Sequence, residues 1–309
     1  MDEQNDQTRP PAQSPSARTR AQWALVGIIV SLALGMAAYR LLKARQIDET
    51  AALFIGLPTL LAVALALTPR AKSATGMIMK GLTIALLLSG PVLQEGFICI
   101  LMASPLFYLV GALVGWAFDS ARARRASQER PLHSLVVLPL LLMSVEGLSP
   151  ALSLPRDLSV GSTKIVAAAP AAVEAHLAAR PRFAATLPPF LRLGFPRPIG
   201  ADGSGLEVGD SRTVYFSRPA APKRLVFVVA ERAPGYVRFR AVSDDTKIGT
   251  WLTWRDAEVR WTPRADGGTD VEWTLHFSRR LSPGWYFGPL ESFGAAAAAD
   301  YLIDSLATP

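Results

Sequence analysis

Two carboxylates at the edges of long apolar runs are the first candidates for chemistry. Glu95 follows the apolar stretch that ends near Gly90, and Glu146 lies close to the end of the run 132–148. Ionisable side chains at membrane depth often serve proton or ion transfer, because a charge in hydrocarbon is costly. A carboxylate at the membrane–water interface is simply solvated, and we expect this second role for both residues.

The other reactive residue types lack the spacing that catalysis or metal binding needs. His133, His176 and His276 are scattered, and the single cysteine, Cys99, lies within an apolar run. The sequence holds no nucleophile elbow, His-Glu-x-x-His, Cys-x-x-Cys or P-loop pattern. The glycines of 200–205 lie between a proline-rich loop and a strand and are interpreted as a turn. We predict no catalytic residue, no metal site and no cofactor.

The basic residues predict membrane topology rather than nucleic-acid binding. The net charge is +7, and the dense basic run Arg122, Arg124, Arg125 and Arg130 stands between two hydrophobic segments. Loops between membrane spans carry Lys and Arg on the cytoplasmic side. We therefore expect the lipid bilayer, and not nucleic acid, as a partner.

The elements that position these residues differ between the two halves of the chain. Half of the 309 residues are hydrophobic, and the apolar runs concentrate in 22–148. A membrane-spanning helix needs about 20 apolar residues. We predict a disordered polar tail over 1–20 and a transmembrane region over 21–149, a helical bundle of four or five spans. The predicted spans are about 23–42, 51–68, 76–90, 97–118 and 132–148.

The distribution of Lys and Arg predicts the orientation of this region. With five spans, one side receives nine basic residues: Arg9, Arg18, Arg20, Arg70, Lys72, Arg122, Arg124, Arg125 and Arg130. The other side receives Arg40, Lys43 and Arg45. The N-terminus is thus predicted to be cytoplasmic and the C-terminal domain extracytoplasmic. If 132–148 does not cross, four spans remain and the domain becomes cytoplasmic.

Two further patterns concern the packing of the helices and the kind of organism that the chain comes from. Gly111 and Gly115 form a small-xxx-small face that allows close helix contact, which we expect within one bundle rather than in a dimer. Asn5 is the only asparagine, whereas Ala, Arg, Pro and Leu abound. This composition favours a GC-rich bacterial genome, so we place the chain in a bacterial inner membrane. The oligomeric state stays open.

After a linker over 150–157, the region 158–309 has the pattern of an α+β domain. A strand over 158–166 precedes a short helix that begins at Pro170, and about five further strands follow. In the strand 271–277, Val271, Trp273, Leu275 and Phe277 alternate with polar residues, so one face is buried and one is wet. A helix over 290–306, with its apolar residues on one face, is predicted to cover the sheet.

This element order resembles the helix-grip fold of the START-like superfamily, also called the polyketide cyclase and lipid-transport superfamily. The resemblance rests on the opening stretch from Val160 to Leu177, the run of strands, and the closing Trp285-Tyr-Phe-Gly-Pro with Tyr301-Leu-Ile-Asp. It implies an antiparallel sheet gripping a long C-terminal helix, and an apolar ligand between them. The residues expected to line such a pocket are Phe227, Phe239, Trp261, Trp273, Phe277, Phe293 and Tyr301.

Three hypotheses of function follow. The first is a membrane-anchored binding protein that holds a lipid or another apolar small molecule. The second is a cyclase-like enzyme acting on an apolar substrate, which requires a buried polar side chain facing the cavity. The third is a structural or interaction protein of the bacterial envelope. A ligand cavity and a filled core are equally compatible with the aromatic residues.

Overall fold

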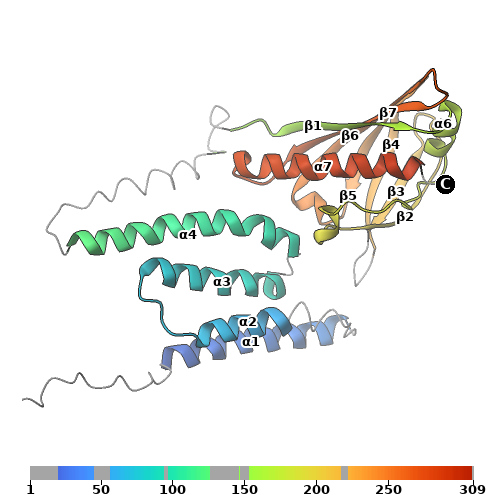
Figure 1. Cartoon of the computed structure of the whole chain (residues 1–309). Helices are drawn as coiled ribbons and strands as arrows, with labels where there is room; N and C mark the ends of the chain where they lie inside the picture. The colour runs from blue at the N-terminus through green and yellow to red at the C-terminus, as the bar shows by residue number, and fades with distance from the viewer. Residues whose placement is uncertain are drawn as a thin grey trace, which may run out of the picture. The chain divides into compact units, whose positions relative to one another are not determined.

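The computed structural model describes residues 20–44, 56–93, 97–125, 146, 153–216 and 222–307. The chain divides into two compact units. One comprises Met1–Glu95 with Phe107–Pro131, and the other comprises Gly96–Leu106 with Leu132–Pro309. Figure 1 labels the helices and strands along the chain.

The N-terminal half is helical, as predicted. Its helices are α1 Arg20–Ala44, α2 Leu57–Leu67, α3 Ala74–Leu93 and α4 Phe97–Arg125. The last carbonyls of a helix lack partners within the helix. Just after α2, the carbonyl of Thr68 accepts hydrogen bonds from Nε2 of Gln22 and Nζ of Lys80, each at 3.0 Å. Two long polar side chains thus donate hydrogen bonds at this helix end.

The start of α3 is fixed by a carboxylate of α4. Oδ1 of Asp119 accepts from the N–H of Ala74 at 2.7 Å. Oδ2 of Asp119 accepts from the N–H of Thr75 at 3.0 Å and from its hydroxyl at 2.7 Å. These bonds satisfy donors that the first turn of a helix leaves free, although the capping residue lies on another helix.

The two small residues Gly111 and Gly115 lie where α4 approaches α3. A Cβ atom on Gly115 would lie 2.5 Å from Cα of Thr75, and one on Gly111 would lie 3.3 Å from Cγ2 of Ile78. The close approach therefore occurs between two helices of one unit. Glycine at 115 is required there, because a larger side chain would collide with the backbone of α3.

Among the described residues, one helix is long and apolar enough to cross a membrane. It is Ile98–Ala123 within α4, with a mean hydropathy of 2.2. The prediction of four or five spans must be corrected for the described helices, since Arg20–Gly35, Leu57–Leu67 and Ala74–Gly90 are shorter. The 11 residues of α2 extend about 16 Å at about 1.5 Å per residue, whereas the hydrocarbon core is about 30 Å thick.

Several predicted features lie outside the described residues. They are residues 1–19 of the polar tail, the carboxylate Glu95, the start of the linker, and the run 132–148 apart from Glu146. The five-span topology is therefore not tested over its last span.

The C-terminal half is built on a seven-stranded antiparallel sheet with the strand order β1-β7-β6-β5-β4-β3-β2. The strands are β1 Asp157–Val166, β2 Pro198–Asp202, β3 Ser211–Phe216, β4 Lys223–Ala233, β5 Tyr236–Asp244, β6 Leu252–Pro263 and β7 Thr269–Arg279. The helical elements are α6 Pro170–Ala178, η3 Leu191–Leu193, η4 Ile248–Thr250 and α7 Gly284–Ala307.

The register of β6 and β7 explains the predicted alternation. Trp261 pairs with Val271 and Ala257 pairs with Leu275, and all four residues are buried. The intervening Glu272 is exposed. One face of the sheet is therefore apolar and must be covered by another element.

The long helix α7 lies along this apolar face, as Figure 1 shows. Its buried residues recur at a spacing of four: Glu291, Ala295, Ala299 and Ile303. The alanines at two of these positions allow the helix to lie close to the strands, because each side chain is a single methyl group. This sheet with its long C-terminal helix is the predicted helix-grip arrangement.

Two boundaries differ from the prediction. The helix α7 begins at Gly284 and continues through Pro289, whereas the sequence indicated a start at residue 290. The stretch interpreted as a turn from residue 200 begins inside β2, and the turn proper follows it, where Gly203 and Gly205 have φ of 89° and 94°. Both boundaries were missed because proline and glycine usually mark the end of a helix or strand.

Candidate functional site

The predicted lining residues fall into two groups. Phe239, Trp261 and Phe277 are buried in the core, with exposed fractions of 4%, 3% and 0%. Phe227 and Trp273 are partly buried and pack against the same core. These five residues thus share the interior face of the sheet.

The two aromatic residues predicted on α7 point to different neighbours. Tyr301 is buried and stacks on Phe183, with ring centroids 6.5 Å apart. Phe293 is 59% exposed, and its ring meets the edge of Phe190 at 4.9 Å. Phe293 therefore does not join the core aromatic residues. Both contacts are made with the segment between α6 and β2.

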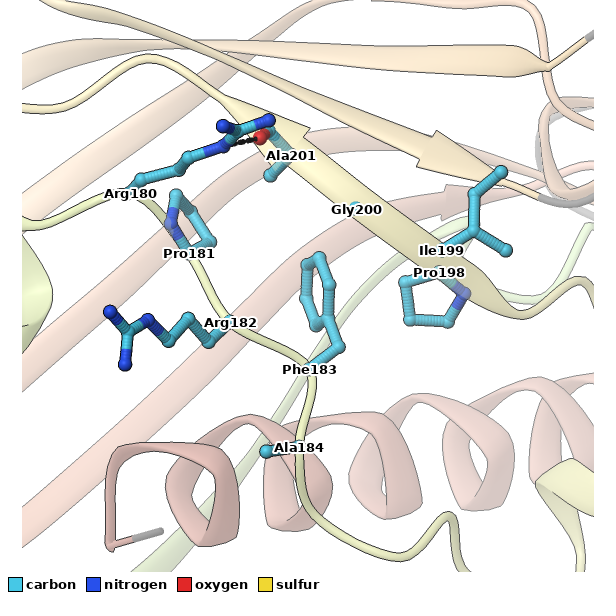
Figure 2. A pocket seen from close by; sticks show the side chains of 9 residues that line it. All are labelled: Arg180, Pro181, Arg182, Phe183, Ala184, Pro198, Ile199, Gly200 and Ala201. Carbon is cyan, nitrogen blue, oxygen red and sulfur yellow. Dashed lines mark hydrogen bonds between the residues drawn. The ribbon is translucent and has the colours of Figure 1, made fainter. Parts of the chain in front are cut away.

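An open hollow of about 400 Å³ lies between this segment and β2. Its walls come from residues 180–184 and 198–201. Figure 2 shows the ring of Phe183 between the two segments, with Pro198 and Ile199 on the strand opposite. Ile199 is 59% exposed. The walls of the hollow are thus mixed, with the apolar side chains of Phe183, Pro198 and Ile199 beside Arg180 and Arg182.

Arg180 fixes one end of the hollow. Its Nη2 atom lies 2.5 Å from Oδ1 of Asp202, and its Nε donates to the carbonyl of Ala201. The contact links the chain that leaves α6 to the end of β2. The hollow is therefore bounded by tied segments, which favours a preformed site.

Two indole N–H groups of the sheet lack partners. Nε1 of Trp254 and Nε1 of Trp273 are buried and have no hydrogen-bond partner among the described residues. Buried polar atoms are normally paired, so each exception requires an explanation. A polar group of a bound molecule is one way to satisfy such a donor.

The sequence analysis overlooked a charged cluster at the start of α7. Arg279, the last residue of β7, is buried. Its Nη2 donates to Oε1 of Glu146 at 2.8 Å, and the two side chains are only 2% and 9% exposed. Glu146 was expected to be a solvated carboxylate at the membrane edge. It lies instead in a buried ion pair.

Glu291 is the second carboxylate of this cluster. It is 6% exposed, and neither carboxylate oxygen has a hydrogen-bond partner among the described residues. Burial raises the pKa of Glu291 to about 7, against the opposing effects of the Arg279 charge and the nearby N–H of Leu281. That N–H is close enough to lower the pKa but lies outside hydrogen-bond geometry. Glu291 therefore titrates near neutrality.

A pattern in the sequence marks both overlooked residues. Arg279 continues the alternation of inward-facing residues at 271, 273, 275 and 277, and Glu291 continues the buried spacing of 295, 299 and 303. A charge that falls in phase with an apolar stripe is a signal of a buried polar site.

Two of the histidines, His176 and His276, take structural positions, and His133 lies outside the described residues. Nε2 of His276 lies 3.5 Å from Oε1 of Glu258 on the outer face of the sheet, and Nδ1 of His176 lies 2.8 Å from the carbonyl of Leu306. Among the described residues, no group of three or more His, Cys, Asp or Glu side chains is placed to hold a metal ion.

The C-terminal half is similar to solved START-type structures. A START superfamily protein from Mycobacterium smegmatis has 15% identity and a TM-score of 0.35, covering 48% of this chain and 94% of its own. For the Zhui aromatase/cyclase from Streptomyces sp. R1128 the values are 15%, 0.33, 48% and 93%. For truncated norcoclaurine synthase from Thalictrum flavum they are 10%, 0.35, 49% and 91%.

At these identities and TM-scores, no function carries over from those proteins to this chain. No protein-family model and no curated protein matches the sequence. The function must therefore be argued from the residues of the domain itself.

Proposed function

We propose that this chain is a membrane-associated binding protein whose helix-grip domain holds a lipid or another apolar small molecule. The observation that carries the proposal is the open hollow of about 400 Å³, in which Phe183, Pro198 and Ile199 lie beside the side chains of Arg180 and Arg182. Ligand sites are typically concave, mostly apolar and about 300–1,000 Å³ in volume. The stacking of Phe183 on Tyr301 connects the hollow to α7.

An apolar ligand gains free energy in this hollow by removing exposed apolar surface from water. Burial of apolar area stabilises a complex by about 25 cal/mol per Å². Ile199 contributes such area, since more than half of its surface is exposed. The helix Ile98–Ala123 would keep the domain near a bilayer, which is a source of apolar molecules.

Photolabelling tests the proposal on the full chain in lipid nanodiscs. We expect an apolar diazirine probe to label the peptides that contain residues 180–184 and 198–201, and Ile199→Asp to reduce that labelling. Ile165→Asp is the matched control, because Ile165 is 62% exposed on β1, outside the hollow. Equal labelling in both variants and the unaltered chain would contradict the proposal.

The enzyme hypothesis is the second candidate, and Glu291 is the observation that favours it. A general acid or base works best when its pKa lies near the operating pH, and the pKa of Glu291 is about 7. Glu291 is not among the residues that line the hollow. Binding is therefore the function that the geometry supports best.

We further propose that the N-terminus is cytoplasmic and that the helix-grip domain lies outside the cytoplasm. The support is the excess of Lys and Arg on the side of the N-terminus. A reporter fused after Pro309 that is active only outside the cytoplasm should be active. Silence from an expressed fusion would place the domain in the cytoplasm.

A further inference from the structure

Four aromatic rings form a continuous chain on the surface of the helix-grip domain. The ring of Phe293 on α7 meets the ring of Phe190 edge-on, with centroids 4.9 Å apart. Phe190 in turn contacts Phe195 at 5.1 Å, and Phe195 contacts Trp251 at 5.6 Å. These rings come from α7, from the segment around η3 and from the residue that follows η4. Contacts across three elements thus hold the surface in one shape.

This surface exposes apolar side chains to solvent. Phe293 is 59% exposed, and Leu193 in η3 is 43% exposed. The other three rings are only partly buried. These side chains form what we term the aromatic patch: Phe190, Leu193, Phe195, Trp251 and Phe293. Exposed apolar patches with a polar rim commonly mark contacts with proteins or membranes.

Positive charge accompanies the aromatic patch. Arg192 and Arg197 belong to the same segment, both are exposed, and neither has an ion-pair partner among the described residues. The carboxylates that precede η4 do not cancel this charge. Asp245 pairs with Arg224 at 3.7 Å, and Asp244 has one oxygen fully buried. Apolar rings and uncompensated cations are therefore found together.

The aromatic patch lies near the end of the domain at which the chain enters it. The N–H of Arg280, which follows β7, donates to the carbonyl of Trp251 at 2.9 Å. Ser278 of β7 pairs with Asp157, the first residue of β1. Figure 1 shows β1 and α7 beginning at the same end of the sheet. The segment that follows α4 in the sequence therefore enters the domain close to Trp251.

We propose that the aromatic patch docks the helix-grip domain onto the surface of an anionic lipid bilayer. Trp, Phe and Leu side chains enter the boundary between headgroups and acyl chains, and arginines beside them attract anionic headgroups. The contact needs little affinity of its own, because a chain with a membrane-spanning helix keeps the patch at a high effective concentration near the bilayer. The inference does not require a ligand in the hollow, but it rests on the proposed association of the chain with a membrane.

The charge of the patch favours lipid over a second copy of the chain. A two-fold dimer uses the same surface on both copies. It would bring Arg192 and Arg197 of one copy toward those of the other, and like charges across an interface are costly. Anionic headgroups instead complement both arginines.

Fluorescence quenching of the full chain in lipid vesicles tests the docking. An environment-sensitive fluorophore is attached at Leu193→Cys, in a chain whose own cysteine is removed by Cys99→Ser. The vesicles contain phosphatidylglycerol and brominated phosphatidylcholine in equal parts. The brominated lipid should quench this fluorophore and not one attached at Ile165→Cys, since Ile165 is 62% exposed near the other end of β1. Equal quenching at the two positions would overturn the docking.

A pair of charge variants tests the part of the arginines. Each arginine near an anionic surface should shift the docking equilibrium about fivefold, so Arg192→Gln with Arg197→Gln should shift it more than about tenfold and reduce the quenching at residue 193. Arg240→Gln with Arg260→Gln is the matched control, because it removes the same charge from arginines that have carboxylate partners. An equal loss of quenching in both double variants would contradict docking through this surface.

Flotation of the vesicles reports the membrane association separately. A chain that does not float with the vesicles would contradict the proposed association and the docking together. Flotation without quenching at residue 193 would overturn the docking alone. Energy transfer between labelled copies, without quenching by the lipid, would assign the aromatic patch to a second copy and would likewise overturn the docking.

Discussion

The helical half and the helix-grip domain place the same kinds of side chain in opposite environments. On α4, Trp116 and Phe118 are 54% and 59% exposed, whereas Trp261 and Phe277 of the sheet are 3% and 0% exposed. Apolar side chains outside a core are costly in water but not in lipid. The difference teaches that composition alone does not define a core, because the surrounding solvent decides where an apolar side chain is stable.

The largest expected effect compares one phenylalanine from each half. Phe277→Ala should destabilise the helix-grip domain by about 3–5 kcal/mol, because it removes a fully buried ring and leaves a cavity. Phe118→Ala on α4 should change stability far less, since its ring is mostly exposed. Thermal unfolding followed by tryptophan fluorescence measures both, because five of the seven tryptophans lie in the C-terminal half. Equal shifts in Tm for the two variants would contradict the difference in burial between the two halves.

The next effect concerns pH. The folded pKa of Glu291 is raised from 4.5 to about 7, so the folded domain binds a proton that the unfolded chain releases. The contribution to stability is present below about pH 4.5 and is lost as the pH rises through about 7, on the order of 3 kcal/mol.

Tm measured between about pH 5 and pH 8 tests whether the stability of the domain falls as the pH rises. The unaltered chain should lose more stability over that interval than Glu291→Gln, which carries no ionisable group at 291. Parallel pH profiles for the two proteins would show that Glu291 does not titrate there.

The smallest effect concerns the cap of α3. Asp119→Ala removes three hydrogen bonds at the start of α3 and should destabilise that turn by about 1 kcal/mol. Hydrogen exchange at the amides of Ala74 and Thr75 should accelerate about fivefold. Asp304→Ala, which removes an exposed pair with Lys164, is the control. Unchanged exchange rates at Ala74 and Thr75 would show that Asp119 does not stabilise the start of α3.

The sequence predicted most of the helix-grip domain because period-two alternation survives in its strands. The strand 271–277 was read directly from Val271, Trp273, Leu275 and Phe277, and β7 contains it. The element β2 was missed because it holds Pro198 and Gly200, residues that usually interrupt strands.

The candidate site was harder to predict than the fold. The hollow depends on how residues 180–184 lie against β2, a contact between segments without periodicity. The ion pair of Glu146 with Arg279 joins residues 133 positions apart, which no local pattern encodes. Tertiary contacts of this kind follow from the packed fold and not from spacing along the chain.

The most direct test of the binding claim is mass spectrometry of small molecules extracted from the purified full-length chain. The account predicts an apolar compound that is enriched in the unaltered protein and in Ile165→Asp but depleted in Ile199→Asp. The same set of lipids in equal amounts from all three proteins would contradict a ligand site in the helix-grip domain.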